Sequence, residues 1–142
     1  MRLTEILTAE RVTTQLTAFT VRARSARAID LVAPPFARFR AAIASPSSYA
    51  DTQALGTAMR AAGVELFRYP SARDATGGGG INVGVLAPTA FGAAKPRGLE
   101  TWHCTASRDR VEVVKRDYFE TAVHLFPREQ FLVNGVLPAP AV

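Results

Sequence analysis

Short apolar runs, each bounded by turn residues, are the feature that most constrains what this chain can fold into. Only the segment from Ser48 to Gly63 has the length and spacing of a full helix, and most other runs have the length of a strand. A chain with many short strands and few helices favours an α+β fold, in which a mostly antiparallel sheet carries two main helices.

The expected strands are recognised from alternation and from their flanking turn residues. Thr17–Arg24 places Phe19 and Val21 on one face and Arg22 and Arg24 on the other, which predicts a half-buried strand. The remaining expected elements of this kind are the strands Ala28–Val32, Val64–Tyr69, Ile81–Leu86, Leu99–Ala106, Val111–Arg116 and Tyr118–Phe126, with a turn near Ser107–Arg110.

Two segments have helical spacing, and we expect both to pack against the sheet. The shorter is Pro35–Ala44. The longer begins at Ser48, which has capping-box spacing to Asp51, an aspartate in place of the usual glutamate. Gly63 suits the position just past the end of this helix. Its predicted buried face consists of Leu55, Ala58, Met59 and Ala62.

Length and composition favour one folded domain over residues 1–142, with a frayed Pro/Ala-rich tail at 138–142. Cys104 is the one cysteine of the chain, so an intramolecular disulfide is excluded and a reducing, cytoplasmic location is favoured. The longest uncharged run, Ala75–Ala94, contains several glycines and Pro88. Such a run is poor as a membrane helix, and we expect no membrane association.

The chain carries a formal net charge of +5, which permits nucleic acid, a membrane surface or an anionic small molecule as partner and selects none of them. The lysines and arginines are scattered, and only Arg22, Arg24 and Arg27 lie close together. This distribution favours a solvated basic surface over a nucleic-acid interface, which stays as the weaker alternative.

The segment with the clearest chemical content follows the strand that ends at Pro70. Tyr69 closes that strand, Ser71 enters the loop, and Arg73 and Asn82 lie close by in sequence. Side chains at a strand end are held rigidly and remain open to a ligand. Because no G-x-S-x-G elbow is present, Ser71 suits hydrogen bonding to a substrate better than attack on it. The alternative is a loop serine and a loop arginine without a ligand.

Two other motifs contain residue types that occur in phosphate-binding or metal-binding sites. Gly77–Gly80 could form a backbone nest for phosphate, although four glycines between strands are more often a flexible turn. His103 and Cys104 are neighbours on a strand, so their side chains face opposite ways and cannot share one metal ion. We expect no metal site, and we expect Trp102, on the same face as Cys104, to lie in the core.

Taken together, several segments resemble the RES-domain family in their order and spacing over Thr17–Val114. They are Ala28-Ile29-Asp30-Leu31 with Pro34-Pro35, Tyr49 to Gly56, Ala61-Ala62-Gly63-Val64, Tyr69-Pro70-Ser71-Ala72-Arg73-Asp74, the glycine run with Asn82, and Pro88-Thr89-Ala90-Phe91.

This resemblance implies a fold similar to ADP-ribosyltransferases and a reaction at NAD, which is a substrate here and not a cofactor. The glycosidic bond to nicotinamide is broken by phosphate or water, and NAD is depleted. The resemblance also implies a toxin neutralised by an Xre-type antitoxin protein. Ser71 matches the family's serine, and we expect Tyr69, Arg73 and Asn82 to bind the substrate beside it.

The family is named for an arginine and a glutamate besides the serine, and neither has a match in the residues before Thr17. We therefore expect the chain to correspond to the C-terminal two-thirds or more of the family domain and to turn over NAD slowly. A non-catalytic remnant that keeps an antitoxin-binding surface is the main alternative. Exposed apolar area would also favour self-association into a homo-oligomer.

Overall fold

The structure is a computed structural model that describes residues 11–74, 79–117 and 121–138. Contacts divide the chain into two compact units: unit 1 is Met1–Thr20 with Lys95–Gly135, and unit 2 is Val21–Ala94 with Val136–Val142. The described residues form seven strands and two α-helices, and all but one of the strand pairings are antiparallel. The predicted α+β class is therefore confirmed.

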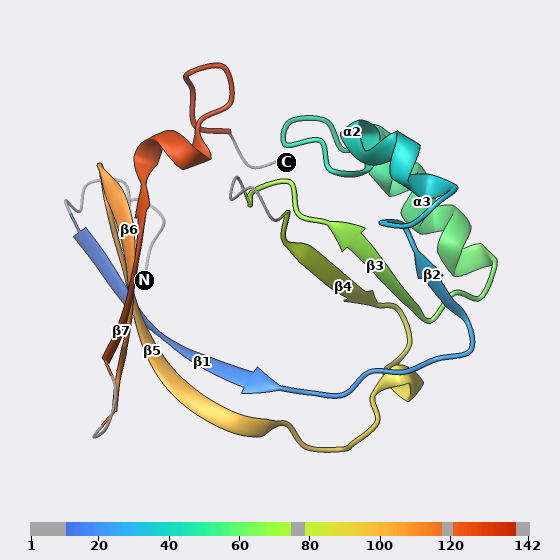
Figure 1. Ribbon diagram of the computed structural model, residues 1–142, viewed down its shortest axis with the longest axis horizontal. Coiled ribbons are helices and arrows are strands. Elements are labelled where there is room, and N and C mark those ends of the chain that lie inside the picture. Colours follow the sequence, from blue (N-terminus) through green and yellow to red (C-terminus); the bar gives the residue numbers. More distant parts are fainter. Residues whose placement is uncertain (1–10, 75–78, 118–120, 139–142) are drawn as a thin grey trace. The chain divides into compact units, whose positions relative to one another are not determined.

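Unit 1 is built on a four-stranded antiparallel sheet of order β1-β5-β6-β7 (Figure 1). A short 3-10 helix, η3 (Arg128–Phe131), follows the last strand. Ser107 closes the β5–β6 turn, because its hydroxyl donates to the Arg110 carbonyl and accepts from the Arg110 N–H. The strands are β1 (Arg11–Thr20), β5 (Arg97–Ser107), β6 (Arg110–Arg116) and β7 (Thr121–Pro127).

The first strand differs from its prediction in extent and in burial. It runs over Arg11–Thr20 rather than Thr17–Arg24, and Phe19 is 55% exposed, so the expected half-buried strand is wrong. The uncharged, threonine-containing residues 12–16 suit a strand, and they extend the pairing with β5. The register shifts between Ala18 and Thr20, and the ladder with β5 ends there.

The strands expected after β1 are present, each with an end shifted by one or a few residues. Of the strand predicted at Tyr118–Phe126, residues 118–120 lie outside the described part, and β7 continues to Pro127. Shifts of this size are usual at strand ends, because hydrogen-bond partners from distant segments decide where a ladder stops.

Unit 2 is a three-stranded sheet of order β2-β3-β4 with helices on one face (Figure 1). The strand β2 pairs in parallel with β3, and β3 pairs antiparallel with β4. Leu31, Met59 and Val64 are buried together at the centre of this layer. The elements are β2 (Ala28–Asp30), η1 (Phe36–Phe39), α2 (Arg40–Ile43), α3 (Ala50–Ala61), β3 (Leu66–Pro70), β4 (Ile81–Val85) and η2 (Pro88–Ala90).

The shorter predicted helix, Pro35–Ala44, forms as two consecutive pieces, η1 and α2. The longer helix forms as α3, but its predicted cap is wrong. The N-cap residue is Tyr49, and no side chain caps the helix. The Ser48 N–H donates to the Ser45 hydroxyl at 3.0 Å, so Ser48 belongs to the preceding turn. Within the described residues, no helix has the length and apolar character needed to cross a membrane.

The C-terminal end of α3 matches its prediction. Gly63 has φ of 71°, a conformation that glycine adopts without strain. The Gly63 N–H donates to the Arg60 carbonyl at 3.0 Å, and the Val64 N–H donates to the Met59 carbonyl at 2.9 Å. These two bonds form a Schellman motif, and the buried Met59 and Val64 side chains add the hydrophobic contact that accompanies it.

The face that α3 buries differs from the predicted one. Ala58 and Ala62 are exposed, whereas Thr52 and Gly56 are partly covered together with Leu55 and the buried Met59. The predicted face and the observed face share Leu55 and Met59. The spacing of apolar residues therefore fits two rotations of the helix about its axis, which differ by about one residue position. The observed rotation turns Thr52 and Gly56 toward the strands.

Candidate functional site

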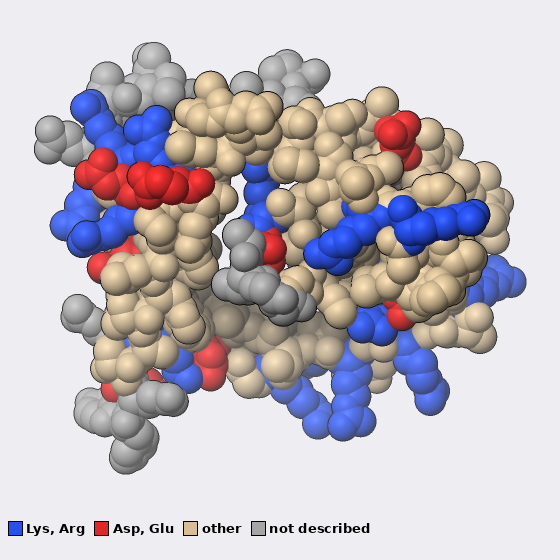
Figure 2. All heavy atoms as spheres, turned by 45° about the horizontal axis from the view of Figure 1, so that its top comes forward, with Lys and Arg blue, Asp and Glu red and all other residues tan. Residues whose placement is uncertain are grey.

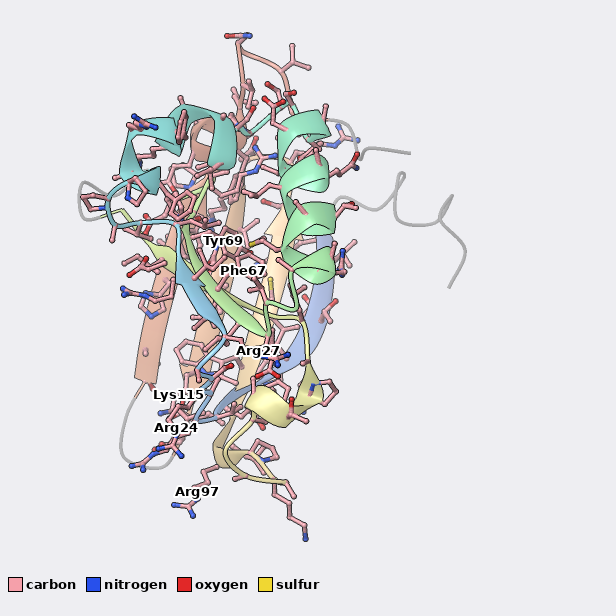
Figure 3. The ribbon with its side chains drawn as sticks, turned by 90° about the vertical axis from the view of Figure 1, so that its right-hand side faces the viewer. Arg24, Arg27, Phe67, Tyr69, Arg97 and Lys115 are labelled. Atoms are coloured by element: carbon pink, nitrogen blue, oxygen red, sulfur yellow. The ribbon has the colours of Figure 1, made fainter. Side chains whose placement is uncertain are left out.

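Unit 2 contains a cavity of about 340 Å³ between α3, the segment before it, and the neighbouring strands β3 and β4. Figure 3 shows Phe67 and Tyr69 of β3, which form part of its wall. The lining is mainly apolar and aromatic, with polar groups where β3 ends. It consists of Leu31, Ile43, Ser45, Tyr49, Thr52, Leu55, Gly56, Met59, Phe67, Tyr69, Pro70, Ser71, Ala72, Arg73 and Asn82.

The alternation of β3 supplies the aromatic wall. Phe67 and Tyr69 lie two residues apart and so point to the same face of the strand, with ring centroids 5.4 Å apart. The register with β4 places Asn82 opposite Tyr69 and Gly84 opposite Phe67. A side chain at Gly84 would overlap the Phe67 ring, so the glycine lets that ring lie across β4. The result is an aromatic wall of two tilted rings, with Asn82 opposite Tyr69.

Ser71 is held at the end of β3 by three backbone hydrogen bonds. Its N–H donates to the Gly80 carbonyl at 2.7 Å, and its hydroxyl oxygen accepts from the N–H groups of Arg73 and Asp74, each at 3.2 Å. The bond to Gly80 continues the β3–β4 pairing past Pro70, which is almost completely buried. Among the described residues, no acceptor is assigned to the Ser71 hydroxyl proton. The hydroxyl can therefore donate to a ligand in the cavity.

Arg73, two residues after Ser71, connects the same turn to a distant segment. Its Nη2 donates to the Pro46 carbonyl at 3.1 Å, which ties the loop after β3 to the segment before α3. Of the described residues that line the cavity, Arg73 is the charged one and none is acidic. The cavity therefore suits an uncharged or anionic group better than a cation.

The structure brings all four predicted site residues, Tyr69, Ser71, Arg73 and Asn82, to one cavity. Their roles toward a substrate stay predictions. The wall residues contributed by α3 and its preceding segment, Tyr49, Thr52 and Gly56, were missed. Thr52 and Gly56 are four residues apart, which is the spacing of one helix face, but that signal identifies a face only after the rotation of the helix is known.

The other predicted features lie elsewhere. Gly77 and Gly78 of the proposed phosphate nest are outside the described residues. No group of three or more His, Cys, Asp or Glu side chains that could hold a metal ion is found in the described part of the chain. Trp102, expected in the core, is only half-buried and stacks on His124 with centroids 5.7 Å apart.

In unit 1, Glu100 forms the centre of a polar network on β5 and β6. Lys115 Nζ donates to Glu100 Oε1 at 2.7 Å, and Trp102 Nε1 donates to Glu100 Oε2 at 3.3 Å. The hydrogen bond from Lys115, followed by that from Trp102, holds the pKa of Glu100 below its ordinary value. This carboxylate is therefore ionised and paired.

Comparison with known proteins gives one family match. The model of the RES domain matches residues 2–107, a range that includes the strand β3, the helix α3 and Ser71. No curated protein matches the chain. Because the family match covers more than half of the sequence, the chain belongs to the RES-domain family, whose members have a toxin-like function related to NAD.

Proposed function

We propose that this protein is a RES-type toxin that degrades NAD by cleaving the bond between nicotinamide and ribose. The observation that supports this most directly is the cavity of unit 2, where Ser71 offers a hydroxyl proton at the end of an aromatic wall. At about 340 Å³ the cavity is at the small end of ligand pockets, roughly 300–1,000 Å³. It suits one ring with part of its ribose rather than a whole dinucleotide.

In this proposal the nicotinamide ring lies against Phe67 and Tyr69, and its carboxamide meets the polar end of the cavity. Ser71 donates to the carboxamide oxygen, and Asn82 lies opposite Tyr69 to accept from or donate to the same amide. Arg73 lines the same cavity and lies on the same turn as Ser71, and its guanidinium suits the diphosphate of an anionic substrate.

The cavity also favours the departing group. When the bond between ribose C1′ and the ring nitrogen breaks, its electron pair passes to the nitrogen, so a cationic ring becomes neutral nicotinamide. An apolar cavity whose described lining has no carboxylate favours the neutral ring over the cation. The ribosyl cation left behind is captured by phosphate or by water, and water loses a proton when the new C–O bond forms.

The resemblance supports three further proposals about context. The toxin acts in the cytoplasm, where its substrate is present. An Xre-type antitoxin protein is its partner. The net charge of +5 attracts anionic NAD rather than nucleic acid. We also propose that the 142 residues behave as one RES-like domain and that exposed strand residues promote self-association.

Replacement of Ser71 tests the proposal. We expect Ser71→Ala to weaken nicotinamide binding about three- to tenfold, because one net hydrogen bond is lost, about 0.5–1.5 kcal/mol. The release of nicotinamide from NAD in phosphate buffer should fall by at least the same factor. Because we propose that turnover by the parent chain is slow, binding is measured by NMR titration beside chromatography of the products.

Ser48→Ala is the matched control, because Ser48 is an exposed serine of the same unit that does not line the cavity. It should leave binding and turnover unchanged. Thermal unfolding of both variants separates a lost ligand contact from a lost turn, since the Ser71 hydroxyl also accepts two backbone bonds. A parent chain that releases no nicotinamide from NAD would sink the proposal.

A further inference from the structure

Gly56 lies in the interior of α3, where glycine is unfavourable. A glycine inside a helix destabilises it relative to alanine, because the backbone loses more freedom on folding and the side chain adds no packing. The same helix uses alanine at four other positions. A glycine retained at this place therefore calls for a local reason.

The protein itself supplies no steric reason for this glycine. Gly56 does not have the positive φ that favours glycine at Gly63. A Cβ built at Gly56 meets only the far end of the flexible Arg60 side chain, at 4.0 Å from Nη1. In contrast, a Cβ at Gly84 would overlap the Phe67 ring. Alanine would thus fit at position 56 without any movement of the described residues.

The space in front of Gly56 is part of the cavity of unit 2. Thr52 and Leu55, which line the cavity from the same face of α3, have larger side chains, so Gly56 is the recessed position in this wall. The Thr52 hydroxyl donates to the Tyr49 carbonyl at 2.9 Å, which engages this proton with the helix backbone. The part of the wall formed by α3 therefore presents mainly apolar groups to the cavity. At Gly56 it has no side chain, so the cavity comes nearest to the helix backbone there.

We propose that Gly56 is the specificity-determining residue of this cavity and keeps open the space for a flat, uncharged aromatic ring between α3 and the Phe67–Tyr69 wall. Glycine makes the helix less stable than alanine would at this position, but it leaves space in the cavity for the ligand. The identification of the natural ring as nicotinamide rests on the proposed function. The shape argument holds for any small aromatic amide, because it depends only on the recess and on the aromatic wall.

The test compares stability with ring binding in the same variants. Gly56→Ala should raise the unfolding temperature by about 2–4 °C. It should also weaken the binding of nicotinamide and of benzamide about tenfold or more, because the added methyl group overfills the recess. Gly56→Leu should abolish binding of both probes. Calorimetry gives the unfolding temperature, and NMR titration gives the affinities.

Ala58 provides matched controls, since it is exposed on α3 and does not line the cavity. Ala58→Gly should lower the unfolding temperature by a similar amount and leave binding unchanged, and Ala58→Leu adds bulk without blocking the rings. The double variant Gly56→Ala/Ala58→Gly should return to the parent unfolding temperature while keeping the weak binding.

The two proposals fail in different ways. If Gly56→Ala binds both rings as tightly as the parent, or if it unfolds at a lower temperature, the role assigned to Gly56 is wrong. A parent chain that binds benzamide but releases no nicotinamide from NAD would contradict the proposed function and leave the inference about Gly56 standing. A parent chain that binds neither ring overturns the inference.

Discussion

Single residues of unit 2 show how the same residue type can have opposite roles. Gly56 has open space before it, whereas Gly84 is covered by the ring of Phe67. Both glycines lie inside regular elements, α3 and β4, where glycine is otherwise unfavourable. Local sequence gives no means of telling the two situations apart, because both depend on a neighbour that is distant in the chain.

Gly84→Ala is therefore expected to destabilise the protein, by about 1–3 kcal/mol, because the Phe67 ring must shift inside a packed layer. The sign is opposite to that of Gly56→Ala. Urea unfolding monitored by circular dichroism measures the difference in free energy. An unchanged free energy for Gly84→Ala would mean that the ring has room to move, and the described wall would then be less rigid than proposed.

The residues of the candidate site that belong to a short sequence pattern could be predicted from the sequence. The Pro-terminated strand followed by polar residues identified Tyr69, Ser71 and Arg73, and Asn82 followed from the next strand. Gly56 and Phe67 were missed, because a cavity wall is defined by how α3 and β3 pack together. No short sequence pattern encodes the rotation of a helix on a sheet to within one residue position.

At the scale of elements, the ends of α3 illustrate the same limit. Its C-terminal end was predicted correctly, since Gly63 determines a Schellman motif within a few residues. Its N-terminal end was not, because Ser45 accepts the hydrogen bond from the Ser48 N–H and so includes Ser48 in an earlier turn. Likewise, β1 ends at Thr20, two residues beyond the register shift after Ala18 and at its last pairing with β5, although its alternation continues to Arg24.

The Glu100 network makes the sheet of unit 1 sensitive to acid. Because the folded-state pKa of Glu100 lies below its ordinary value of 4.5, its contribution to stability is present above that value and is lost as the pH falls through the lowered pKa. Glu100→Gln should therefore lower stability modestly at pH 7 and make little difference at strongly acid pH. The effect stays small, since the Glu100 side chain is 42% exposed.

Urea unfolding of both proteins at pH 7 and pH 3 checks this expectation. The paired cation is Lys115, whose side chain is only 15% exposed, so Lys115→Met should reduce the same pH dependence and leave the smaller part that comes from Trp102. A difference between Glu100→Gln and the parent that is as large at pH 3 as at pH 7 would assign the effect to packing rather than to ionisation.

At the scale of the whole molecule, Lys and Arg residues occur in both units. Within each unit taken by itself, the Lys and Arg side chains on the face drawn in Figure 2 lie in separate groups rather than in one stripe. A nucleic-acid interface needs a continuous basic surface that follows the backbone, usually with aromatic rings for stacking. We therefore keep the proposal that the partner is a small anion rather than DNA or RNA.

We expect binding to a generic DNA duplex at physiological salt to be no tighter than non-specific binding, about 10⁻⁴ M. Fluorescence anisotropy with a labelled duplex over a salt series measures it, with a single strand of the same length for comparison. Submicromolar binding that weakens steeply with added salt would contradict this expectation and favour a nucleic acid over a small anion as the partner.

The order of strands in unit 1 has a consequence for how the protein forms. Thr20 of β1 pairs with Arg97 of β5, although nearly all of unit 2 lies between them in sequence. Closing so long a loop is slow and entropically costly while the intervening chain is unfolded. The two ends of unit 2 are already joined, by the bonds from Arg24 N–H to the Ala90 carbonyl and from Gly92 N–H to the Arg22 carbonyl. We therefore expect that, during synthesis, β1 emerges before unit 2 and completes its sheet after unit 2 has folded and brought β5 to it.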